Sequence, residues 1–583
     1  MASGASPILH IVVVGFNHLK GWQVEYSYPA FKDDEVSSFC PEKWKYLSHL
    51  AIPDGSHNYD EDTVYFHLPS LDSDDRTVFA VGCYRQVAAA GVKNKAADVT
   101  RRTIQKSIVV LSSLPLYDRI EVKLSLVATA YCAQNDFAEY GILKEAYGNL
   151  RNCLTYPLPL KSYGASLSLP EVLCDFYHET LTLLKLILLE KRVLIFGSPV
   201  KPMCRALLTL VSVFPGTLEK GLDYCISTLK TPPCHPELDL EHFSLPSENL
   251  NADYLDVDAG CNNGDEDTGL PLSVSGSSSE IMGSQNSIVS AALTKGLSDS
   301  ESSNKATSRI SLFETKLGSA VWGSDLGKEA ETSVTSPSPS PSNLTDEECG
   351  FPLRIFGEGY LFHPFVSLSN MEVLTEREVY GFVAGTSNAL LIEKKELFDV
   401  QIEFASHRLT ISDAELRKQL RLTTEDLRFL DNLVRVNSSE KQDYIEGVGW
   451  QGGEEWMRSQ FRNYIVQLLR ATQLPESTRE NECFNPHFLQ AFKKTKIYSR
   501  WMENAQLDIL KLQPLHPGCG HMSVSDVKLR LSHTISTTES GRKLSFAAVT
   551  TGKAVAQTGK AVGDVISLAK SNFSAWWNGG SNV

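Results

Sequence analysis

The sequence lacks the features of a secreted protein. Its first residues, MASGAS, contain neither the basic segment nor the long apolar segment of a signal peptide. The 12 cysteines are scattered from Cys40 to Cys519 and include no C-x-x-C pair. We therefore expect reduced thiols in a cytoplasmic protein.

Basic residues are too few for a protein that binds nucleic acid. The formal net charge is −15 at pH 7, whereas a phosphate backbone selects basic surfaces. The whole excess of acidic residues lies in residues 231–350, which contain 20 Asp and Glu against 5 Lys and Arg. In the rest of the chain the two signs balance, so nucleic acid is not an expected partner.

No long apolar segment is free of charge. Residues 181–200 come closest, with twelve Leu, Ile, Val or Phe side chains that favour membrane insertion by roughly 4–7 kcal/mol in all. The same window holds Lys185, Glu190, Lys191 and Arg192, which together cost roughly 10 kcal/mol near the bilayer centre. A transmembrane span is therefore not expected, and we interpret this run as buried protein core.

The pattern around this run predicts a central α/β module. Residues 171–189 are typical of an apolar helix that begins after Pro170, and residues 193–196 are typical of a short buried strand. Residues 203–214 predict the next helix. A buried strand between two helices indicates a sheet that is covered on both faces.

The N-terminal segment predicts a separate α+β module of about 150 residues. Its first two strand candidates, 8–16 and 22–28, are joined by a short turn and predict a hairpin. Further elements are expected as strands at 62–68, 77–87 and 107–114, and as helices at 119–134 and 138–152.

Residues 231–349 predict a disordered acidic insert. From residue 273 to residue 342, 21 of 70 residues are serine, so the segment cannot bury enough apolar surface to offset its ordering entropy. Ser336, Ser338 and Ser340 each precede a proline and are candidate phosphorylation sites. A solvated linker without a regulatory role explains the composition equally well.

The last third of the chain predicts helices up to about residue 515. Ser412-x-x-Glu415 and Thr423-x-x-Asp426 resemble capping boxes that open two of these helices. Residues 454–470 predict an amphipathic helix with one apolar face, formed by Met457, Phe461, Ile465, Leu468 and Leu469.

The sequence contains no complete catalytic or metal-binding motif. His178-Glu179-Thr180-Leu181-Thr182 lacks the second histidine of H-E-x-x-H, and we interpret it as a His–Glu pair on a helix surface. Gly552 and Gly559 are seven residues apart rather than five, and Ala561 stands where a phosphate-binding loop has Ser or Thr. We therefore expect no enzyme chemistry, no cofactor and no metal ion.

The residues Gly385, Thr386, Ser387 and Asn388 predict a tight turn before a buried segment. Glycine allows a positive φ, and the three polar side chains can cap nearby backbone groups. A ligand-binding loop is the alternative, but turn-forming residues need no ligand to explain them.

Several stretches of the sequence together resemble the DENN superfamily, and most closely the late secretory pathway Avl-nine family. The resemblance spans nearly the whole chain, and its stretches are specific in combination rather than singly. In order they are ILHIVVVGF…WQVEYSYP, HNYDEDTVYFHLP, VFAVGCYRQ, QKSIVVLSSLPLY, LLEKRVLIFGSPV, YLFHPFVSL, GFVAGTSNALL, SVSDVKLRLSH and TGKAVAQTGKAVG.

The resemblance implies a longin-like N-terminal (upstream DENN) module at 1–155 and a central DENN-like module at 160–230 and 350–405. A helical (downstream DENN) module at 406–515 and a basic amphipathic tail at 516–583 would follow. It also implies a regulator of late secretory or recycling traffic that binds a Rab-type small GTPase, with effects on cell migration and polarity. Such a protein would associate peripherally with Golgi-derived or recycling endosomal membranes. The alternative is a scaffold or membrane tether without nucleotide-exchange activity.

Residues 541–583 predict a helix that binds a membrane surface. They carry five Lys or Arg and one Asp, and on a helical wheel the apolar and basic side chains fall on opposite sides. Such a helix can lie in the interface of an anionic bilayer. Packing of its apolar face on the protein itself or on a partner helix is the alternative. The candidate membrane-binding residues are Leu544, Lys553, Val555, Lys560, Val562, Ile566, Lys570, Phe573, Trp576 and Trp577.

Overall fold

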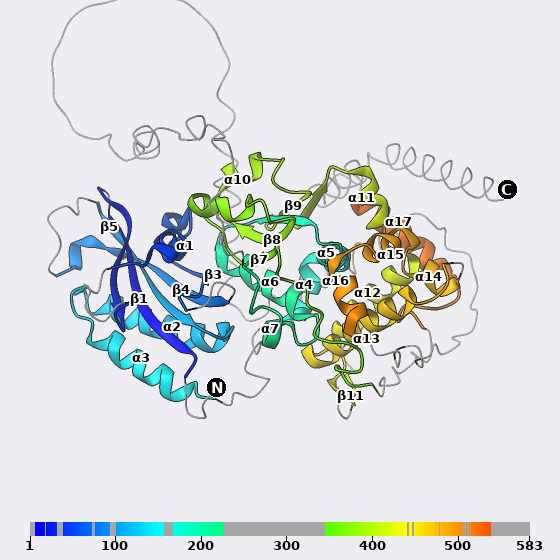
Figure 1. The fold of residues 1–583 in the computed structure, drawn as a ribbon, viewed down its shortest axis with the longest axis horizontal. Coiled ribbons are helices and arrows are strands. Elements are labelled where there is room, and N and C mark those ends of the chain that lie inside the picture. The colour runs from blue at the N-terminus through cyan, green and yellow to red at the C-terminus, as the bar shows by residue number, and fades with distance from the viewer. Residues whose placement is uncertain are drawn as a thin grey trace, which may run out of the picture. The chain divides into compact units, whose positions relative to one another are not determined.

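The described residues of the computed structural model form a mixed α/β fold, as predicted, with two five-stranded sheets and a group of C-terminal helices (Figure 1). The predicted phosphorylation sites and the predicted tail helix at 541–583 lie outside the described residues. The described residues are 6–17, 19–31, 39–72, 76–93, 101–156, 167–226, 344–439, 442–445, 448–476, 478–504, 509, 512 and 515–537.

The N-terminal sheet is antiparallel, with the strand order β2-β1-β5-β4-β3. The side chains of Val12, Val13 and Val14 are all fully buried. Because neighbours in a strand point to opposite faces, both faces of this sheet are covered. The predicted elements lie close to their expected positions: β1 (Ile8–Asn17), β2 (Gly21–Tyr28), β3 (Glu61–Pro69), β4 (Thr77–Ala88), β5 (Thr103–Ser112), α2 (Tyr117–Ala133) and α3 (Gly141–Cys153). The short helix α1 (Leu47–Ala51) was not predicted.

The second sheet has the strand order β10-β9-β6-β8-β7 and is parallel except for its edge strand β10. Its apolar side chains alternate between two cores: Val193 and Ile195 of β6 face one, and Leu194 faces the other. The predicted α/β sheet with two covered faces is confirmed. Its strands are β6 (Arg192–Phe196), β7 (Tyr360–His363), β8 (Gly381–Thr386), β9 (Val400–Glu403) and β10 (Arg408–Ile411).

The apolar run at 181–200 is protein core, as predicted. It forms the end of α5 (His178–Leu188), the whole of β6 and the turn before α6 (Val200–Ser212), and nearly all of its apolar side chains are buried. None of the helices in the described part of the chain combines the length and the apolar character needed to cross a membrane.

The single helix predicted at 171–189 is wrong, because the structure divides it into α4 (Leu169–Phe176) and α5. Tyr177 separates them with a positive φ of 44°. The apolar pattern continues across the break, so periodicity did not reveal it. The break also turns His178 inward, where it is buried beside the rings of Tyr177 and His533. The predicted surface position of His178 is therefore wrong as well.

The C-terminal helices follow the predicted pattern, with one correction at a helix start. Thr423 and Asp426 form a capping box at the start of α12, as predicted. At α11, however, Asp413 rather than Ser412 is the N-cap residue, and its carboxylate accepts from the N–H of Glu415. The bounds are α10 (Ala389–Glu393), α11 (Ala414–Gln419), α12 (Thr424–Asn437), α13 (Glu454–Thr472), α14 (Arg479–Cys483), α15 (Pro486–Phe492), α16 (Lys496–Asn504) and α17 (Val524–Thr537); a short hairpin of β11 (Tyr444–Ile445) and β12 (Gly449–Trp450) follows α12.

A buried ion pair connects α5 to these helices. The Nζ of Lys185 lies 2.5 Å from a carboxylate oxygen of Asp426, and both side chains are inaccessible to solvent. The Tyr464 hydroxyl donates to Asp426 over 2.8 Å, and a ring nitrogen of His516 lies 3.2 Å from the same carboxylate. Burial alone would raise the pKa of Asp426, but Lys185 and the hydrogen bond with His516 hold it well below its usual range.

The substitution Lys185→Met should lower the free energy of unfolding by about 3–5 kcal/mol, because it leaves the Asp426 charge buried without its counterion. Urea denaturation of the full chain measures this change. The matched control is Glu61→Gln, which removes the partner of Arg85 from a pair whose carboxylate is largely exposed and should cost about 1 kcal/mol or less. Equal effects of the two substitutions would contradict the role given to the buried pair.

Candidate functional site

The loop that carries Ser387 and Asn388, between β8 and α10, contacts a loop of the N-terminal module. The Ser387 hydroxyl donates to the backbone oxygen of Asp54 over 2.8 Å, and the Asn388 amide donates to the Asp54 carboxylate over 3.0 Å. The Asn388 side-chain oxygen also caps α10 by accepting from the N–H of Leu390. These two residues therefore join the second sheet to the N-terminal module, as well as starting a helix.

Gly385 is needed for a different reason from the one predicted. It lies inside β8 and does not have a positive φ. A Cβ atom at this position would lie 2.3 Å from the backbone oxygen of Pro364 and 2.7 Å from the Cε of Met203. Glycine is therefore required here because the backbone of Pro364 and the side chain of Met203 in α6 lie too close for a Cβ atom, and not because of a tight turn.

Two further contacts join the same surfaces. The Ser198 hydroxyl, in the β6–α6 turn, donates to the Tyr59 hydroxyl over 3.1 Å. The Tyr46 hydroxyl donates to the carboxylate of Glu372 over 3.2 Å. We call the surface around these contacts the seam loops: residues 46–60 of the N-terminal module with residues 198, 372 and 386–390 of the second sheet.

Beneath the seam loops, the carboxylate of Asp62 holds the start of α6. It accepts from the backbone N–H groups of Val200 and Lys201 at 2.8 and 3.1 Å, and from that of Thr63 at 2.8 Å. Burial raises the pKa of Asp62, and the three donors partly offset this rise. An acidic residue of β3 thus satisfies the free N–H groups and the positive end of a helix from the other sheet.

A second buried link runs through His67 of β3. One ring nitrogen of His67 lies 2.8 Å from the backbone oxygen of Phe362 in β7, and the other lies 2.6 Å from the Tyr117 hydroxyl. A backbone oxygen can only accept, so Nδ1 carries the proton and Nε2 accepts from Tyr117. Burial lowers the pKa of His67 to about 3, so the ring is neutral.

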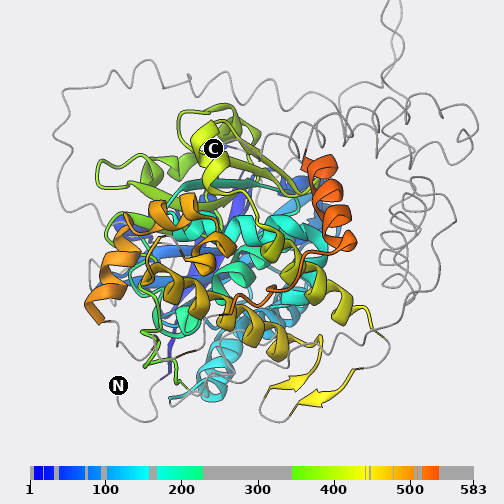
Figure 2. The same ribbon diagram turned by 90° about the vertical axis from the view of Figure 1, so that its right-hand side faces the viewer.

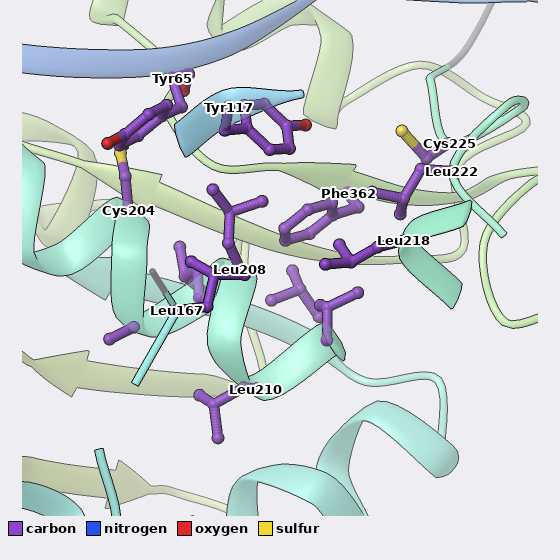
Figure 3. Packing of buried hydrophobic residues seen from close by; sticks show 14 of the residues in the cluster. Tyr65, Tyr117, Leu167, Cys204, Leu208, Leu210, Leu218, Leu222, Cys225 and Phe362 are labelled. Carbon is purple, nitrogen blue, oxygen red and sulfur yellow. The ribbon is translucent and has the colours of Figure 1, made fainter. Parts of the chain in front are cut away.

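Apolar packing fills the space around these polar links. Figure 3 shows Tyr65 and Tyr117 of the N-terminal module beside Cys204 and Leu208 of α6, with Phe362 of β7 close by. The Tyr65 hydroxyl donates to Glu121 over 2.5 Å, and Lys201 pairs with the other oxygen of that carboxylate. The two sheets are therefore fixed in one orientation by a core with paired polar groups.

The buried His67 ring and the two nearby cysteine thiols between the sheets are uncharged. His67 has both ring nitrogens occupied. Burial raises the pKa of the Cys225 thiol to about 12 and that of Cys204 well above the ordinary range, so neither is a reactive thiolate. Among the residues that the structure describes, no group of three His, Cys, Asp or Glu side chains is placed to hold a metal ion.

A separate hollow of about 440 Å³ lies where the α5–β6 turn meets α11 and α15. Glu190 in its wall accepts from the N–H groups of Lys496 and Ile497 at the start of α16. The wall also carries Lys191, Lys494 and Glu415. Acidic and basic groups balance, and Glu190 already has partners, so no ligand class follows from this hollow.

Sequence reasoning found Ser387 and Asn388 but missed their partners. Asp54 is 333 residues away in the chain from Ser387, and no local pattern connects them. A signal for Asp62 and His67 was present, because both are polar residues within the apolar strand β3. Buried polar residues in a strand require partners, but the sequence alone does not identify which.

These features describe a mixed α/β protein whose two sheets are joined by buried polar contacts. Loops from both sheets lie together on one surface. The chain belongs to the Avl9 family, described as transport protein Avl9, whose pattern matches residues 8–472. This confirms the resemblance to the Avl-nine family seen in the sequence.

Two relatives carry names that bear on function. The late secretory pathway protein avl9 of Schizosaccharomyces pombe is 25% identical over 536 residues, which cover 88% of this chain and 91% of that protein. The late secretory pathway protein AVL9 of Saccharomyces cerevisiae is 25% identical over 568 residues, which cover 89% of this chain. The match covers 61% of the Saccharomyces protein, so this chain spans less than two thirds of it.

Three buried histidines predict a loss of stability in mild acid. Burial lowers the pKa of His67 and His178 to about 3 and that of His363 to about 4, whereas an unfolded histidine titrates near 6.5. Between these values the unfolded chain binds more protons than the folded chain. The stability is therefore complete above about pH 6.5 and falls as the pH decreases towards 4.

The variant His67→Gln isolates one of these groups, because glutamine can also donate to Phe362 and accept from Tyr117. Urea denaturation at several pH values between 4.5 and 7.5 should show a slope near pH 5 that is smaller by about 1.4 kcal/mol per pH unit than in the parent. His487→Gln, at an exposed position, should leave the slope unchanged. An unchanged slope in His67→Gln would show that His67 is not the buried neutral group described above.

Proposed function

We propose that this protein regulates membrane traffic in the late secretory pathway by binding a Rab-type small GTPase on the seam loops. The family description as a transport protein and the names of the two relatives support the trafficking role. The resemblance to the DENN superfamily supports a GTPase as the partner. An effect on cell migration and polarity would follow from this role in traffic.

The observation that carries the proposal is the pairing of Asp54 with Ser387 and Asn388. It holds loops from two sheets in one surface, so a partner that touches both loops meets a preformed site and loses little additional freedom on binding. We assign the N-terminal antiparallel sheet to the longin-like module and the second sheet to the DENN-like module. The strand orders and the parallel core of the second sheet support this assignment.

Such a protein accelerates nucleotide release by stabilising the nucleotide-free GTPase through binding, without covalent chemistry. This mechanism requires a rigid platform, because a surface that yields cannot shift the conformation of its partner. The buried links through Asp62 and His67 would supply that rigidity. Peripheral association with Golgi-derived or recycling endosomal membranes would follow from the basic residues 541–583.

A scaffold or tether without exchange activity is the second candidate. The hairpin of β11 and β12 favours it, because Tyr444 and Trp450 face each other across the two strands with their rings 5.3 Å apart and both side chains are largely exposed. Exposed tyrosine and tryptophan side chains are typical of protein–protein contact sites. Such a surface would let the protein bind a second component without changing a nucleotide state.

Release of fluorescent GDP from a panel of Rab-type GTPases tests the first candidate. The full chain should accelerate release from at least one of them, and Leu390→Arg should abolish the effect, because Leu390 is exposed beside Asn388. The control is Leu19→Arg, which places the same charge on an exposed leucine of the β1–β2 turn and should have no effect. Binding without acceleration would favour the scaffold, and a panel that neither binds nor responds would contradict the GTPase role.

A further inference from the structure

The last described helix, α17, presents an apolar stripe to solvent. Val524, Val527 and Leu531 are spaced three and four residues apart, so they lie on one side of the helix. Their side chains are 72%, 43% and 39% exposed, and Met522 just before the helix is 66% exposed. In Figure 2, α17 (orange-red) lies along the outer edge of the ribbon.

Polar contacts to α12 and the packing of the His533 ring on His178 hold α17 on the protein. The Arg428 guanidinium donates to both oxygens of Asp526 at 2.6 and 2.8 Å, and lowers the pKa of that carboxyl to about 2. Arg530 donates to the hydroxyl of Thr424. Both contacts reach α12, against which α17 packs. These contacts fix the orientation of α17 about its own axis. The apolar stripe therefore faces solvent because the opposite side of the helix is bound to α12.

The charge around the stripe is positive. Lys528 is exposed and lies between Val524 and Leu531 on the same side of the helix. Asp526, the acidic residue of α17, is buried and already neutralised by Arg428. The segment 541–583, which begins four residues after Thr537, the last residue of α17, contains five basic residues and one acidic residue.

We propose that the stripe of Met522, Val524, Val527 and Leu531, with Lys528 among them, docks on the surface of an anionic lipid bilayer. Aliphatic side chains beside exposed lysine are the combination by which interfacial helices bind such a surface. The stripe is too short to hold a protein on a membrane alone, and the basic segment that follows it supplies the second signal that stable association requires. This inference rests on the proposed role in membrane traffic and names a lipid-contacting site for it.

The charge pattern argues against the other occupants of this stripe. The segment 541–583 has the same sign of charge as Lys528, so electrostatics do not favour its folding back on α17. A second copy of α17 would bring two such lysines together. An anionic bilayer, in contrast, carries a charge opposite to that of Lys528.

Flotation of the full chain with phosphatidylcholine vesicles, with or without about 30% phosphatidylserine, tests the proposal. The triple variant Val524→Ser, Val527→Ser, Leu531→Gln should bind the anionic vesicles about tenfold more weakly or worse. The control, Val122→Ser with Leu126→Gln, changes two aliphatic side chains of α2 that are 64% and 71% exposed and should bind like the parent. Lys528→Glu should weaken binding to anionic vesicles and leave binding to neutral vesicles unchanged.

Three results would overturn the proposal. The first is parent-like vesicle binding by the triple variant, which would leave membrane contact to residues 541–583 alone. The second is a parent protein that dimerises through the stripe, seen as a dimer in sedimentation that the triple variant abolishes. The third is tighter vesicle binding by the triple variant, which would mean that the stripe restrains the following segment. GDP release measured without lipid is independent of these results, so a failure here is distinguishable from a failure of the proposed GTPase role.

Discussion

The fold depends on ion pairs and hydrogen bonds to the charged residues inside its most apolar segment. Residues 178–212 form two buried helices and the central strand of the second sheet. Lys185 is fully buried there, so loss of its partner would be strongly destabilising. Each paired charge contacts a different element of the protein: Lys185 pairs with Asp426 of α12, Glu190 accepts from the start of α16, Arg192 pairs with Asp399 before β9, and Lys201 pairs with Glu121 of α2. Three of the charges that disfavour membrane insertion, Lys185, Glu190 and Arg192, thus attach other parts of the protein to this segment.

The two sheets are linked to each other by several buried contacts. Asp62 of β3 links the N-terminal sheet to α6, and His67 of β3 links it to β7. Helix α6 in turn packs against β8 of the second sheet. A surface assembled from loops of both sheets therefore keeps its shape when nothing is bound. Such a surface would suit the proposed binding of a GTPase, because a preformed surface loses less entropy on association.

Local patterns in the sequence predicted most strands and helices, and long-range contacts explain what they missed. The strands of the N-terminal sheet, β6 and the Thr423 capping box follow from alternation and capping residues within a few positions. The burial of His178 beside His533 and the close approach of Met203 to Gly385 depend on residues that lie far away in the chain. At the candidate site, Ser387 and Asn388 were identified as structural, whereas Asp54 could not be predicted as their partner.

Hydrogen exchange of the native protein tests most directly whether the apolar segment unites the modules in one folding unit. We predict that amides in the central strands β1 and β6 and in helix α13 exchange only through global unfolding, with one common free energy. Lys185→Met should lower all three by the same amount. Amides of β1 that exchange with a clearly lower free energy than those of β6, or that keep their protection in Lys185→Met, would show that the N-terminal sheet is an independent unit and would contradict this view.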